Sequence, residues 1–163
     1  MILQQYEDVS QFYTHSKDYL LRHEAIHAVL LGICDLLIQN PQKYNYLPYL
    51  ATVGADEQII AVAIRTPRRP LLLSLSQNLA AMNLIAQNLI EYLYSHQQLL
   101  PGVNAPVAES QAFASSWASI TGQSYKLKMA LRAFQLDSLL QPSQPPGYFR
   151  VATGRIKKSS KSG

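Results

Sequence analysis

The stretch His-Glu-Ala-Ile-His, residues 23–27, combines residue types and a spacing that could bind a metal. Two histidines four positions apart lie on one face of a helix. In the H-E-x-x-H pattern of zinc peptidases, both imidazoles bind the metal and the glutamate acts as general base on the metal-bound water. In this interpretation His23 and His27 are ligands and Glu24 is the base. One hypothesis for the chain is therefore a zinc hydrolase.

A zinc hydrolase also needs a third protein ligand, for which the sequence offers poor candidates. His15, His96 and Glu57 belong to other predicted elements, and the positions that could extend the motif hold leucine, glycine, isoleucine and Cys34. On a helical projection, both histidines fall at the border of an apolar stripe formed by Ile26, Leu30, Ile33 and Leu37. We therefore expect packing histidines, no bound metal, and no catalytic or cofactor-binding residue in this chain.

Composition predicts one folded domain of ordinary size. The chain has 163 residues, 48% of them hydrophobic, which is enough apolar material for a core. No apolar run reaches the roughly 18 residues that cross a bilayer, and the N-terminus lacks the pattern of a secretion signal. The single cysteine, Cys34, lies among apolar residues and is expected to be a small buried hydrophobe. These features predict a soluble cytoplasmic protein without a membrane partner.

The net charge of +4 comes from the C-terminal end of the chain. Arg155, Lys157, Lys158 and Lys161 account for all of it, which leaves residues 1–154 at a net charge of zero. A short basic tail without interleaved aromatic residues is more typical of a disordered end than of a nucleic-acid arm. We expect no nucleic-acid partner.

Hydrophobic periodicity predicts an α/β fold with a mixed, mostly antiparallel sheet flanked by helices. Helical patterns cover 9–40 as one long or two consecutive helices, ended by Asn40 and Pro41, and then 77–97 and 106–122. Strand patterns occur at 1–6, on both sides of a turn at 54–56 within 46–67, and at 70–76, 99–103 and 125–137. These elements predict a domain at 1–140, a Pro-rich linker at 141–147, and a remnant strand with a disordered basic tail at 148–163.

Several segments resemble, in order and spacing, the N-terminal domain of a group of bacterial proteins in the GNAT superfamily of N-acetyltransferases. The resemblance covers about residues 5–153. Its most specific pieces are "LPGV" at 100–103, "WASITG" at 117–122 and the pattern formed by Met129, Arg132, Phe134 and Leu136. In the similar proteins the helix around HEAIH usually reads like "NEAENN" and has no metal role, so the resemblance implies that the motif here is accidental.

The resemblance also implies where acetyl-CoA binds in the intact proteins. Their cofactor site belongs to a second, C-terminal domain, in which an R/Q-x-x-G-x-G/A turn offers backbone amides to the pyrophosphate. No such turn occurs in this sequence. We therefore expect the non-catalytic N-terminal half of an acetyltransferase, truncated here, that binds no cofactor itself. The alternative is a complete small protein that acts as a stand-alone binding or dimerisation module, with a homo-oligomer as its assembly.

Other polar residues have two interpretations each. The corner with Arg65, Arg68 and Arg69 could bind an anion, although a solvated turn is more typical of such a run. Three tyrosines could line a pocket or pack at the edge of the core: Tyr44, Tyr46 and Tyr49. Ser74, Ser110 and Cys34 lack the local context of an activated nucleophile.

Overall fold

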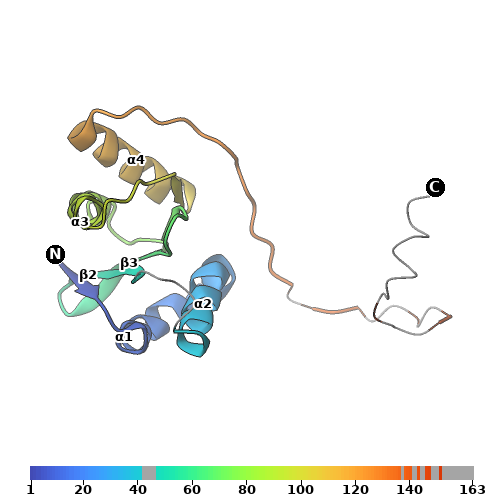
Figure 1. Ribbon diagram of the computed structural model, residues 1–163. Coiled ribbons are helices and arrows are strands. Elements are labelled where there is room, and N and C mark those ends of the chain that lie inside the picture. Colours follow the sequence, from blue (N-terminus) through green and yellow to red (C-terminus); the bar gives the residue numbers. More distant parts are fainter. Residues whose placement is uncertain (42–46, 137, 141–142, 144–145, 148–150, 152–163) are drawn as a thin grey trace.

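The protein is described here from a computed structural model, which describes residues 1–41, 47–136, 138–140, 143, 146–147 and 151 (Figure 1). Its elements follow the order β1 (Ile2–Tyr6), α1 (Val9–Leu21), α2 (Glu24–Gln39), β2 (Tyr49–Ala55), β3 (Gln58–Arg65), β4 (Leu71–Leu73), α3 (Ala81–Ser95), β5 (Val103–Asn104) and α4 (Val107–Thr121). The predicted α/β class is confirmed. The helical stretch at 9–40 forms two helices, and the predicted hairpin forms from β2 and β3.

The five strands form one sheet in the order β1-β2-β3-β4-β5, so β1 and β5 are its edge strands. Neighbouring strands pair antiparallel except β4 and β5, which are parallel. Between β2 and β3, Val53 pairs with Ala61 and Gly54 pairs with Ile59, which leaves Ile60 as an extra residue in a β-bulge. Such a bulge turns an additional side chain toward one face of the sheet, and Ile60 packs into the core cluster on the α3 side.

Helices cover both faces of the sheet (Figure 1). Ala51 and Val53 of β2 face α3, whereas Leu50 faces α1 and α2, because successive side chains of a strand point to opposite faces. The helical pattern at 77–97 forms α3, whose residues Met82, Ile85, Ala86, Leu89 and Leu93 are buried, whereas Leu79, which the pattern also places on the apolar face, precedes the helix and is 43% exposed. Gly122 ends α4 with φ of 72°, a left-handed conformation that glycine adopts without strain.

The prediction of a strand at 125–137 is wrong for residues 125–136, which the structure describes. None of them joins the sheet, and the segment runs away from the body after α4 (Figure 1). Its apolar side chains stay exposed, for example Leu127 at 83% and Leu131 at 77%. An alternating pattern specifies a face, but a strand also needs a partner edge, and β5 offers only Val103 and Asn104 between prolines. The strand predicted at 148–153 lies outside the described residues except for Val151.

Candidate functional site

The two histidines of the HEAIH motif have different environments. His23 precedes α2 as its N-cap residue and is exposed, as is Glu24 in the first turn. His27 is only 1% exposed, whereas Ile26 beside it is 47% exposed. The buried stripe of α2 therefore consists of His27, Leu30, Cys34 and Leu37. The prediction that both histidines pack at the border of a stripe containing Ile26 is wrong, because His27 belongs to the buried stripe itself and His23 is exposed before the helix.

Both ring nitrogens of His27 have backbone hydrogen-bond partners, so the buried side chain leaves no polar atom unpaired. Nδ1 lies 2.8 Å from the carbonyl oxygen of Leu20, and Nε2 accepts the N–H of Leu75 at 3.0 Å. Since Nε2 accepts, the proton resides on Nδ1, which donates to Leu20. Burial lowers the pKa of His27 and keeps the ring neutral.

This arrangement leaves neither nitrogen of His27 available to a metal. Among the described residues, no group of three or more His, Cys, Asp or Glu side chains is placed to hold a metal ion. The rings of His23 and His27 lie 6.1 Å apart and nearly perpendicular to each other. The sequence of the helix thus matches the zinc motif, but His27 uses its ring nitrogens for hydrogen bonds that link α1 and α2 to the turn after β4.

That turn, between β4 and α3, is held by two side chains and one backbone carbonyl from other elements. The N–H of Leu75 donates to His27, and the N–H of Ser76 donates to Oε1 of Glu109 at 2.8 Å. Glu109 comes from the first turn of α4 and is 3% exposed. The N–H of Ser74 donates to the carbonyl of Val62 at 2.9 Å. Three consecutive backbone amides of the turn are therefore already occupied.

Tyr19 completes this network from α1. Its hydroxyl donates to the carbonyl of Ile60 at 2.7 Å and also contacts the carbonyl of Leu75, and burial raises its pKa. Its ring stacks on His27 with 6.1 Å between centroids. The hydroxyl of Ser76 donates to the same carbonyl of Ile60 at 3.0 Å. Polar groups from both helical layers thus meet at one turn.

The remaining sequence candidates do not form a site together. Arg65 is 2% exposed and donates to Gln98 Oε1 at 2.5 Å and to the carbonyl of Leu99 at 2.9 Å, whereas Arg68 and Arg69 are exposed. Burial lowers the pKa of Arg65, and its Nε has no hydrogen-bond partner within the described residues. The expectation of a solvated turn is therefore wrong for Arg65.

Two further candidates, Tyr49 and Cys34, are buried in the core. Tyr49 is fully buried and donates to Asn88 Oδ1 at 2.8 Å, while Tyr44 and Tyr46 lie outside the described residues. Cys34 is buried, and desolvation raises the pKa of its thiol to about 12, so that it is not an activated thiolate. Of the two interpretations of Tyr49, its burial favours packing, and the expectation that Cys34 is a small buried hydrophobe is confirmed.

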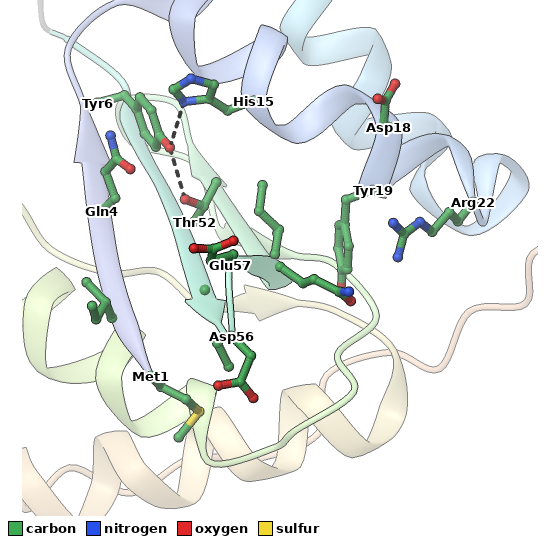
Figure 2. Close-up of a pocket in the computed structure, with 15 residues that line it drawn as sticks. Met1, Gln4, Tyr6, His15, Asp18, Tyr19, Arg22, Thr52, Asp56 and Glu57 are labelled. Atoms are coloured by element: carbon green, nitrogen blue, oxygen red, sulfur yellow. Dashed lines mark hydrogen bonds between the residues drawn. The ribbon is translucent and has the colours of Figure 1, made fainter.

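An open cleft of about 760 Å³ lies beside β1, between α1 and the turn that joins β2 to β3 (Figure 2). Tyr6 and His15 lie at one end of it, and Asp56 lies at the other. His15 Nδ1 is 3.2 Å from Tyr6 Oη, which is 3.1 Å from Thr52 Oγ1. These groups form a short hydrogen-bonded chain from α1 across β1 to β2.

The lining of the cleft is predominantly acidic among its charged side chains. Asp18, Asp56 and Glu57 contribute carboxylates, Arg22 contributes one guanidinium, and Met1 adds the N-terminal amino group. Figure 2 shows Glu57 in the middle of the opening and Arg22 at its far side. No local motif indicated this cleft, because Tyr6 and Thr52 are 46 positions apart and become neighbours only when β1 pairs with β2.

No family model, curated protein or solved structure matches this chain. Within the part of the chain that the structure describes, no helix is long and apolar enough to cross a membrane.

Proposed function

We propose that this domain is a non-catalytic module of the GNAT type, which serves an acetyltransferase as a supporting half and does not bind acetyl-CoA itself. The proposal rests on the sequence resemblance and keeps the cytoplasmic location expected from composition. The observation that carries its non-catalytic part is the occupied turn between β4 and α3.

A strand followed by a tight turn and a helix is where backbone N–H groups bind the phosphates of a nucleotide. Here the N–H groups of Leu75 and Ser76 already donate to His27 and Glu109. The N–H of Ala80, at the start of α3, donates to Asn78 Oδ1 at 3.0 Å. An incoming pyrophosphate would have to displace these acceptors and would meet the carboxylate of Glu109. The N–H groups of the turn therefore already have acceptors, and the carboxylate of Glu109 would repel the anion.

Titration calorimetry with acetyl-CoA tests the proposal. The full chain is expected to show no saturable heat, with circular dichroism as the check that the sample is folded. Binding with a micromolar dissociation constant would overturn the non-catalytic assignment.

A matched variant, Glu109→Gln, shows whether the turn excludes a phosphate by the charge of Glu109 or because its N–H groups already have acceptors. The amide oxygen of glutamine still accepts from Ser76 while the negative charge is gone. We expect this variant to remain unable to bind acetyl-CoA, because its amides stay occupied. If neutralisation alone produced binding, the turn would be a cofactor site with a removable charge, contrary to the proposal.

A further inference from the structure

The segment 125–136 and the open edge of β1 are complementary in pattern and in charge. In the segment, Lys126 and Lys128 alternate with the apolar residues Leu127, Met129 and Leu131, and Arg132 adds a third basic group. No acidic residue interrupts residues 125–136. The segment thus has the two-faced pattern of a half-buried strand, although its apolar side chains are exposed in the single chain.

Tyr125, at the start of the segment, and Gln123 just before it contact α4. Gln123 Oε1 accepts from Trp117 Nε1 at 3.0 Å, and the hydroxyls of Tyr125 and Ser115 lie 3.1 Å apart. Beyond Tyr125 the chain leaves the body in an extended course (Figure 1). The side chains of Leu127, Met129 and Leu131 are 83%, 66% and 77% exposed, so this apolar face is available to another molecule.

The edge of β1 is the longer of the two sheet edges within the described residues. β1 is a five-residue strand that pairs only with β2, whereas β5 has two residues. Ile2, Gln4 and Tyr6 line the acidic cleft, and Leu3 packs against the core cluster on the opposite face, under α3. A strand added to β1 would therefore have one face over the cleft and one face beside the α3 layer.

From this match we propose that segment 125–136 adds as a strand to the β1 edge of a second copy of the chain, and that the two copies exchange their segments reciprocally. Lys126 and Lys128 then face Asp56 and Glu57 of the other copy, while Leu127 and Met129 face its α3 layer. Shifting the register by one residue would reverse the faces and place ammonium groups against apolar surface. The charge pattern thus selects which face of the added strand lies over the cleft.

Strand addition satisfies the free backbone groups of both partners. An edge strand presents unpaired N–H and C=O groups, and an extended peptide that pairs with it gains main-chain hydrogen bonds, while alternate side chains determine specificity. Reciprocal exchange has two-fold symmetry, so every contact forms twice. This inference concerns assembly and does not depend on whether the domain binds acetyl-CoA.

Charge reversal on each side provides the test. Variant A carries Lys126→Glu and Lys128→Glu, and variant B carries Asp56→Lys and Glu57→Lys. Sedimentation and native mass spectrometry of the full chain are expected to show a concentration-dependent dimer that weakens as salt increases. Each variant alone is expected to have a dimer dissociation constant at least about tenfold higher, because like charges then face each other.

Mixing the variants distinguishes exchange between chains from folding back within one chain. In an A–B heterodimer both contacts again join opposite charges, so the mixture is expected to form heterodimers while A and B alone stay mostly monomeric. The controls reverse exposed charges outside the interface, Lys17→Glu and Glu91→Lys, and are expected to dimerise like the wild type. Circular dichroism confirms that all variants are folded.

Three results would overturn the proposal. The first is a wild-type chain that stays monomeric at all concentrations. Protection of the segment from hydrogen exchange in such a monomer would show that it pairs within its own chain. The second is dimerisation of A and B that matches the wild type, which would indicate another interface. The third is a mixture of A and B that forms no heterodimer.

Discussion

The turn between β4 and α3 and the turn between β2 and β3 are both polar, but their polar groups have different surroundings. At the first turn, Leu75 and Ser76 donate to buried side chains, and little of that network reaches water. At the second turn, Asp56 and Glu57 are exposed beside an open cleft, and both have positive φ, 48° and 61°. One turn joins the layers of the fold, and the other presents charge at the surface.

This difference predicts two kinds of mutational effect. Removing a buried acceptor leaves its donor without a partner and without water, which destabilises the fold. Changing an exposed carboxylate costs the fold little, because water replaces the lost interaction. Substitutions at the first turn are therefore expected to lower stability, whereas those at the second are expected to alter association.

The largest effect is expected for His27→Ala. The substitution leaves the N–H of Leu75 without its acceptor, removes the side-chain donor to the carbonyl of Leu20, which still accepts from the N–H of His23, and opens a cavity beside Tyr19. We therefore expect a loss of about 2–4 kcal/mol in the free energy of unfolding. The measurement is denaturant unfolding followed by circular dichroism. His23→Ala, in the same motif but exposed, is the control and is expected to change stability by less than about 0.5 kcal/mol. Equal losses in the two variants would contradict the structural role of His27.

A smaller effect is expected from pH at the same histidine. Burial lowers the pKa of His27 in the folded state below its ordinary value near 6.5, so below that pH the unfolded chain binds the proton more readily. The contribution of His27 to stability is thus complete above about pH 6.5 and decreases as pH falls toward the folded pKa. Glu109 acts in the opposite direction but less strongly than burial.

Unfolding curves measured across this pH window test the sign. The wild type and His23→Gln are both expected to lose stability between about pH 7 and pH 5, since both retain His27. The loss is expected to be slightly smaller in His23→Gln, because His23 also lowers the pKa of His27. His27→Gln, whose amide can both donate and accept, is expected to show a shallower dependence. An unchanged pH dependence in His27→Gln would assign the titration to another group.

The sequence predicted the parts of the fold that depend on local pattern. The spacing of Met82, Ile85 and Leu89 is helical in any environment that buries one face, and Gly122 was a recognisable helix end. The hairpin around residues 54–56 also followed from local composition. Each of these elements contains within itself most of the information that determines its type.

The errors arose where the structure depends on distant partners. The burial of His27 requires Leu20 and Leu75, which occupy other elements, so a helical projection ranked Ile26 above it. The occupied turn depends on Glu109, which is more than thirty positions from Ser76. Residues 125–136 have a clear strand pattern, yet a strand requires an edge that local pattern cannot supply.

The smallest expected effect is a gain in stability at the second turn. Glu57 has φ of 61°, a region that costs an L-residue about 1–2 kcal/mol, and two-residue hairpin turns with both φ values positive favour glycine there. Glycine also increases the entropy of the unfolded chain, so Glu57→Gly is expected to stabilise the fold by at most about 1 kcal/mol. Thermal unfolding at low protein concentration, where dimerisation does not contribute, measures this gain.

The matched control for this substitution is Gln58→Gly, at the exposed first position of β3. Its φ is not positive, so glycine is expected to cost about 0.5–1 kcal/mol there. The dimer supplies a second readout, because Glu57→Gly also removes one of the carboxylates that face the basic segment. The same substitution should therefore strengthen the fold and weaken association. Stabilisation of both would show that Glu57 is not part of the interface, and destabilisation of the monomer would show that its conformation is not strained.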